Sequence, residues 1–141
     1  MPPAAPMSLA ISARIIHAAL VLGVMLFLGI SLYVGSNSPV PASALPDRRV
    51  LYLGLFVVSA VLFGAAMYTA ARMTRPGHGI SQDEWWRANL SRAIGIWALV
   101  EAPAILGMVA YFLTHDFRTL IAPFFGLFLF LHYRPSRLAK G

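Results

Sequence analysis

Cysteine is absent from the 141 residues of this chain, and charged residues are scarce at 11%. Without cysteine the chain has no disulfide framework, no thiolate metal site and no cysteine nucleophile. A soluble domain carries about 25% charged residues, and a disordered chain is rich in charge and poor in hydrophobic residues. Because hydrophobic residues make up 59% of this chain, the composition excludes both classes and predicts an integral membrane protein.

Motifs for catalysis are also lacking. The sequence contains no phosphate-binding glycine loop, no cluster of metal ligands at a characteristic spacing and no recognisable catalytic triad, so we do not expect an enzyme. The formal net charge is +6, but in a membrane protein an excess of basic residues sets the topology. We therefore expect the lipid bilayer as a partner and no nucleic acid.

Hydrophobic stretches long enough to cross a bilayer recur along the chain. A bilayer core of about 30 Å requires about 20 apolar residues of helix. Such stretches cover residues 15–34, 50–71 and 93–113, and a shorter one covers 119–133. We predict an all-α integral membrane protein with four transmembrane helices, forming a single domain over residues 1–141. The first stretch exceeds the roughly 7–15 apolar residues of a secretion signal, so we expect it to remain as an anchor.

The basic residues predict the orientation of these spans. With four spans, both termini and the central loop lie on one side of the membrane. That side carries Arg14, Arg72, Arg75, Arg87, Arg92, Arg134, Arg137 and Lys140, whereas the other side carries Arg48, Arg49 and Arg118. The positive-inside rule then places both termini in the cytoplasm, and we expect the protein in a bacterial cytoplasmic (inner) membrane.

The segment before the third span has the pattern of a helix start. Ser81 and Glu84 have the spacing of a capping box, in which each side chain bonds the backbone N–H of the other residue. Trp85 and Trp86 follow at once, and tryptophan collects at the headgroup region of membranes. We predict a short interfacial helix that begins near Ser81 and enters the membrane at Arg92, with both tryptophans and Arg92 as interfacial anchors.

Weak similarity relates the two halves of the chain. A shift of 62 residues aligns Phe63-Gly64 with Phe125-Gly126, and a shift of 78 aligns Arg14 with Arg92. Two related hairpins produced by duplication would give this pattern. Apolar helices of low complexity also give it by chance, so both interpretations stay open.

Glu101 is the most informative residue, because it lies near the middle of the third span. A charged carboxylate at that depth costs about 3 kcal/mol, so such residues face protein or water and indicate a functional site. The other interpretation is that Glu101 is neutral and joins two helices by a hydrogen bond. Pro103 lacks an N–H and leaves the carbonyl of Leu99 unbonded, and we expect this acceptor to lie beside the acid.

The sequence around Glu101 resembles a known helix. Residues 98–112 read ALVEAPAILGMVAYF, which is similar to the carboxylate-bearing helix of the rotor-ring c subunits of F- and V-type ATP synthases. The resemblance extends weakly back to Ile94, and Arg72–Pro76 is similar to the polar cytoplasmic loop of that family. It implies that Glu101 takes up and releases an ion within a homo-oligomer or a larger energy-converting membrane complex. With no Ser, Thr, Asn or Gln nearby, a proton is expected rather than sodium.

Two alternatives remain. In the first, the chain is a structural accessory subunit that packs on a larger membrane complex, and Glu101 forms a hydrogen bond between helices. His17 and His132 lie at the same predicted end of the bundle, and two histidines on facing helices can hold a b-type haem or another tetrapyrrole. Each also suits a simple role in interfacial packing. We expect no other cofactor and no metal site.

Overall fold

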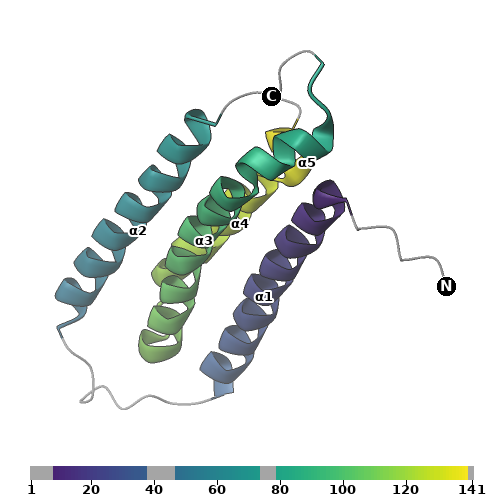
Figure 1. Cartoon of the computed structure of the whole chain (residues 1–141). Coiled ribbons are helices and arrows are strands. Elements are labelled where there is room, and N and C mark those ends of the chain that lie inside the picture. The colour runs from purple at the N-terminus through teal and green to yellow at the C-terminus, as the bar shows by residue number, and fades with distance from the viewer. Residues whose placement is uncertain (1–7, 38–46, 74–78, 140–141) are drawn as a thin grey trace.

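The chain is helical throughout the part that the computed structural model describes, which comprises residues 8–37, 47–73 and 79–139 (Figure 1). The elements are α1 (Leu9–Asn37), α2 (Arg48–Ala71), α3 (Gln82–Thr114), the 3₁₀ helix η2 (Phe117–Leu120), α4 (Ile121–His132) and α5 (Pro135–Leu138). Three of them, α1, α2 and α3, are long and apolar enough to cross a membrane. The prediction of an all-α fold is therefore confirmed, with three candidate membrane spans.

The predicted fourth span is a shorter helix than the other three. The 12 residues of α4 rise by about 18 Å, and the four residues of η2 add about 8 Å. The resulting length of about 26 Å falls slightly short of a hydrocarbon core of about 30 Å. Residues 117–132 thus form one apolar helical segment that is shorter than a typical span.

The longest helix, α3, lies at the centre of the bundle. It packs against α1, α2 and α4, whereas α1 and α2 each have α3 as their main neighbour and lie on either side of it (Figure 1). The last two spans form a packed antiparallel hairpin through His115 and Asp116. The first two spans do not form the matching hairpin, because α3 separates them.

The two ends of the bundle differ in the residues they carry. The start of α1, the end of α2, the start of α3 and α5 lie together at one end, which we call the basic end (Figure 1). Its arginines in the described ranges are Arg14, Arg72, Arg87, Arg92, Arg134 and Arg137. The other end, which we call the far end, holds the start of α2 and the turn between α3 and α4, with Arg48, Arg49 and Arg118.

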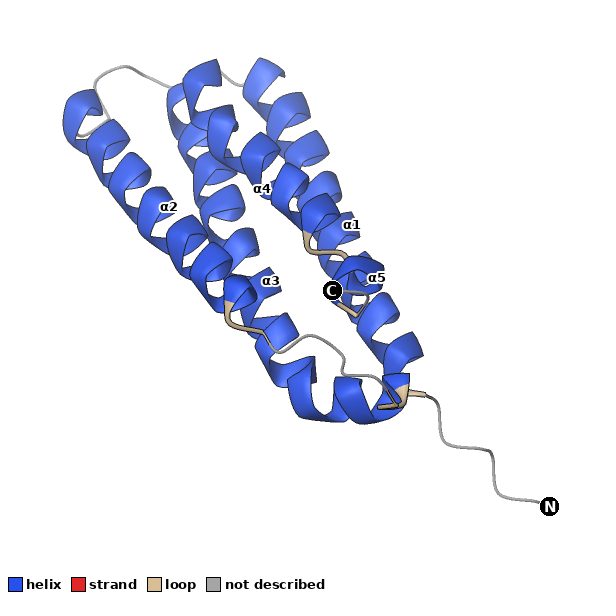
Figure 2. Ribbon diagram, turned by 90° about the horizontal axis from the view of Figure 1, so that it is seen from above, coloured by secondary structure: helices blue, strands red, loops and turns tan. Residues whose placement is uncertain are grey.

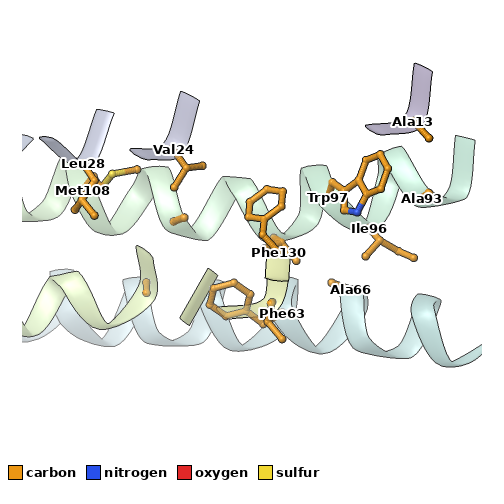
Figure 3. Close-up of a cluster of buried hydrophobic side chains, with 14 of the residues drawn as sticks. Ala13, Val24, Leu28, Phe63, Ala66, Ala93, Ile96, Trp97, Met108 and Phe130 are labelled. Carbon is orange, nitrogen blue, oxygen red and sulfur yellow. The ribbon is translucent and has the colours of Figure 1, made fainter. Parts of the chain in front are cut away.

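Most of the core is contributed by α3. Ile96, Trp97 and Met108 on α3 are fully buried, and Val24 of α1 and Phe130 of α4 pack in the same cluster (Figure 3). The most apolar part of α3 is half buried, whereas α1 and α2 bury only 17% of theirs. The remaining surface of α1 and α2 is apolar. Such a large apolar surface is unfavourable in water but is stable in contact with the acyl chains of a bilayer.

Two glycines allow α3 and α4 to approach closely. A Cβ on Gly107 would lie 2.6 Å from Cδ of Pro123 and 2.7 Å from the carbonyl oxygen of Thr119. A Cβ on Gly126 would lie 3.0 Å from Cβ of Ala104. The backbones of the hairpin are therefore in contact at two levels, as small residues permit in membrane helices.

The predicted start of α3 is confirmed in its capping. Ser81 Oγ accepts from the backbone N–H of Glu84 at 3.2 Å, and Glu84 Oε2 accepts from the backbone N–H of Ser81 at 3.2 Å. The first turns of α3 are set at an angle to the rest of the helix, across the end of the bundle where α1 begins (Figure 2). There Asp83 accepts from the backbone N–H of Ala10 at 3.4 Å.

The two tryptophans of this segment are buried in the bundle, whereas anchors that face the headgroups would be exposed. Trp85 and Trp86 are only 4% and 1% exposed and stack edge to face at 4.9 Å. Their rings fill the basic end of the core, so they face the interior of the bundle and not its surface. Arg92, in contrast, is exposed. The bend at the start of α3 explains the difference, because it turns the first helical turns over the core.

Candidate functional site

Glu101 lies in the middle of α3 and is partly exposed. Its carboxyl group makes no hydrogen bond and no ion pair with any residue in the described part of the chain. The interpretation of Glu101 as hydrogen-bonded glue between helices of this chain therefore has no partner group to support it. Any partner of the carboxyl lies outside the described residues.

The position of Glu101 on the helix explains this exposure. Ile94 and Ile105 lie within about 40° of it around the helix, and they are 36% and 37% exposed. Trp97 and Met108 flank it on the other side and are fully buried. Glu101 thus lies at the border between the membrane-facing side of α3 and the side that packs on α1.

No polar side chain of α1 lies at the level of Glu101. The two helices run in the same direction, with Ala13 beside Ala93 and Leu28 beside Met108 (Figure 3). The facing stretch of α1, residues 20–24, reads LVLGV. The carboxyl is consequently surrounded by apolar side chains on its protein side and by the membrane region on the other.

Pro103 lies on the other side of α3 from Glu101. Residues two apart on a helix are separated by about 200°, and Pro103 is fully buried in the bundle. Leu99, whose carbonyl Pro103 leaves without its usual donor, is likewise two residues from Glu101. The free carbonyl of Leu99 as an acceptor beside the acid stays a prediction, and α3 continues unbroken through the proline.

His17 and Trp97 join α1 and α3 to the end of α4. His17 Nε2 donates to the carbonyl oxygen of Phe130 at 3.0 Å, and Trp97 Nε1 donates to that of Tyr133 at 2.9 Å. The rings of His17 and Trp97 are in edge contact, 5.1 Å apart. The last carbonyls of a helix have no donor within the helix. His17 and Trp97 therefore supply hydrogen-bond donors to two carbonyl oxygens at the end of α4.

His132 has a different environment from His17. It is exposed, its Nδ1 lies 3.2 Å from a guanidinium nitrogen of Arg137, and its ring packs beside Tyr133. The two histidines share no contact among the described residues, and Nε2 of His17 is already bonded. The geometry brings together His17 and Trp97, which the sequence did not single out as a pair, and it gives no support to axial ligation by His17 and His132.

At the far end, Tyr52 of α2 and the turn between α3 and α4 meet at Asp116. The backbone N–H of Arg118 lies 2.9 Å from Oδ1, and the Tyr52 hydroxyl donates to Oδ2 at 2.8 Å. These donors hold the pKa of the Asp116 carboxyl below its usual range, the N–H of Arg118 most strongly. Asp116 therefore remains charged and ties α2 to the hairpin.

Among the described residues, no three His, Cys, Asp or Glu side chains gather as a metal site. In comparisons with known proteins, no family, no curated protein and no solved structure matches this chain.

Proposed function

We propose that this chain is a proton-binding subunit of a membrane complex, in which Glu101 takes up and releases a proton at the membrane-facing border of α3. The observation that supports the proposal is the isolation of this carboxyl, which is partly exposed and has no partner among the described residues. An acid used as structural glue would have a hydrogen-bond partner on a neighbouring helix.

The chemistry of an isolated intramembrane acid favours exchange. Facing lipid, the carboxyl is stable only in its neutral form, because the charged form costs about 3 kcal/mol at the centre of a helix. When water or a cationic group of another subunit reaches Glu101, the charged form is stabilised and the proton leaves. The environment outside α3 thus decides whether the proton is bound.

The local resemblance to rotor-ring c subunits supports the same role. There the carboxyl belongs to a helix of similar sequence, and the resemblance implies a homo-oligomer or a larger energy-converting complex as the partner of this chain. A border position on α3 is suited to this arrangement, because a neighbouring subunit that packs on α3 would cover Glu101.

Carbodiimide labelling tests the proposal. Dicyclohexylcarbodiimide is apolar and modifies protonated carboxyls, so the membrane-embedded protein should be labelled at Glu101 and the labelling should fall as the pH rises. Glu101→Gln should abolish labelling. Glu84→Gln is the matched control, since this acid is exposed and glutamine keeps the capping box.

A different result would favour the accessory-subunit interpretation. If the wild type is not labelled at any pH, and Glu101→Gln assembles with its co-purifying partners as the wild type does, proton exchange is refuted. Native mass and identification of co-purifying chains in mild detergent decide between a homo-oligomer and a larger complex.

We also propose that the basic end faces the cytoplasm of a bacterial inner membrane. Six arginines of the described ranges lie at the basic end and three at the far end, and basic residues are retained on the cytoplasmic side. Because the chain has no cysteine, single substitutions report topology directly. Ser36→Cys should react with a membrane-impermeant maleimide from the periplasm, and Ser136→Cys should react only after the membrane is opened.

A further inference from the structure

An elongated groove separates α2 from η2 and α4. Its volume is about 650 Å³, and its lining includes Phe56, Ser59, Phe63 and Met67 of α2, Arg118 of η2 and Phe125 of α4. The lining is apolar apart from a few polar groups near the far end. From Tyr52 to Met67 the groove follows α2 for about 22 Å, which is the shape of a chain rather than of a compact ligand.

The depth of the polar groups follows from the register of the two helices. Phe63 and Phe125 are in edge contact at 5.0 Å, and α2 and α4 both start at the far end (Figure 1). Counting back from this contact, Ser59 lies about 6 Å nearer the far end than Phe63. Arg118 lies about 12 Å nearer the far end than Phe125. Ser59 is therefore about 6 Å deeper in the membrane than the backbone of Arg118.

The hydroxyl of Ser59 has no hydrogen-bond partner among the described residues. Ser59 is 8% exposed. Two other hydroxyls of the bundle bond the carbonyl four residues before them: that of Thr69 on α2 bonds Ala65, and that of Thr114 on α3 bonds Ala110. A hydroxyl left unbonded in an apolar setting is costly. Turning about a single side-chain torsion between staggered positions presents the Ser59 hydroxyl to the groove.

The guanidinium of Arg118 is also available to a ligand. It forms no hydrogen bond with any described residue, and its charge acts on Asp116 only at a distance; the Asp116 carboxyl accepts from the Tyr52 hydroxyl and from the backbone N–H of Arg118. At the far end, Arg48, Arg49 and Arg118 face Asp47 and Asp116. Three positive charges against two negative ones leave this end with a net charge of +1, which favours an anion.

We propose that this groove binds one anionic glycerophospholipid of the leaflet at the far end. Its phosphate contacts Arg118, an ester carbonyl a few bonds below the phosphate accepts from the Ser59 hydroxyl, and one acyl chain lies along Phe63 and Phe125 toward Met67. Charge, depth and shape each match one part of such a lipid. The site is separate from Glu101, which lies on the other border of α3.

Lipid titration followed by native mass spectrometry tests this proposal on the full-length protein. Phosphatidylglycerol should bind with higher affinity than phosphatidylcholine. Arg118→Gln should weaken phosphatidylglycerol binding about fivefold, the effect of one basic residue at a membrane surface. Arg137→Gln at the basic end is the matched control and should leave the affinity unchanged.

The role of Ser59 is tested with a lipid that lacks the ester carbonyl. The wild type should bind diester phosphatidylglycerol about fivefold more tightly than its diether analogue, as one hydrogen bond allows. Ser59→Ala should bind both lipids equally, and it should fold normally because its hydroxyl has no partner to lose.

Equal affinity of the wild type for the ester and ether lipids, or an unchanged affinity in Arg118→Gln, would overturn the proposal. Ala60→Phe, which fills the groove, provides the last check. It should remove the bound lipid without changing the number of protein chains in the particle. If it instead releases a protein chain, the groove is a protein interface and the lipid assignment is wrong.

Discussion

Substituting Gly107 by alanine tests the close packing of the central hairpin. The added methyl carbon would lie 2.6 Å from Cδ of Pro123, 2.7 Å from the backbone oxygen of Thr119 and 3.0 Å from Cβ of Ala122. None of these atoms is the end of a flexible side chain. Relief therefore requires α3 and the start of α4 to move apart, and contacts along the hairpin weaken with them.

The expected magnitude follows from a comparison within the same helix. Gly95 is also in α3, and a Cβ there would meet no atom within 4 Å. Gly95→Ala and Gly107→Ala gain the same helix propensity, up to about 1 kcal/mol, so this gain cancels between them. Overpacking a rigid site costs about 1–3 kcal/mol. Gly107→Ala should therefore be less stable than Gly95→Ala by about that amount.

Equilibrium unfolding in mixed detergent micelles with increasing dodecyl sulfate measures this difference, with the fluorescence of the buried tryptophans as the signal. Gly126→Ala should give an intermediate cost, because its added Cβ would lie 3.0 Å from Cβ of Ala104 and 3.4 Å from a backbone oxygen. Equal stability of Gly107→Ala and Gly95→Ala would refute the close contact of α3 with α4.

Three further predictions concern hydrogen bonds. Trp97→Phe leaves the carbonyl of Tyr133 without its donor and should lower the free energy of unfolding by about 1–3 kcal/mol in the same assay. Amide exchange in α4 should become faster, and an unchanged exchange rate would show that the Trp97 hydrogen bond does not hold the end of α4. Ser81→Ala removes the cap of α3 and should cost about 1 kcal/mol, whereas a neutral result would mean that the first turns contribute nothing. Because the pKa of Asp116 is lowered in the folded protein, its stabilising effect is complete above the unfolded pKa of about 3.9 and is lost as the pH falls through the folded value. Tyr52→Phe removes one donor and should flatten this acid-induced loss of stability; an unchanged pH profile would show that the Tyr52 bond does not contribute.

The sequence was sufficient for features that depend on neighbouring residues. The helix start at Ser81 was readable because a capping box involves residues three positions apart. The apolar stretches were readable because crossing a bilayer is a matter of length and composition. The short fourth helix was also visible as a stretch of about 15 residues, and the 3₁₀ turn at residues 117–120 is the detail that composition did not reveal.

The buried face of each helix was decided only by tertiary structure. A helix that is apolar on all sides has no amphipathic stripe to show which face packs, and α3 is such a helix over most of its length. For this reason Trp85 and Trp86 were expected at the surface and are instead buried. The pairing of His17 and Trp97 with carbonyls of α4 joins residues far apart in the sequence, which no local pattern encodes.

Glu101 shows which properties of a residue follow from the sequence and which depend on the tertiary structure. The sequence alone determined that a carboxyl group lies in the middle of an apolar helix, because apolar residues extend for about half a span on either side of it. Only the packing of α3 between α1, α2 and α4 decided that this carboxyl is at a membrane-facing border without a partner in the described chain. The physical reason is that depth follows from position along one helix, whereas solvation depends on the side chains that neighbouring helices place around it.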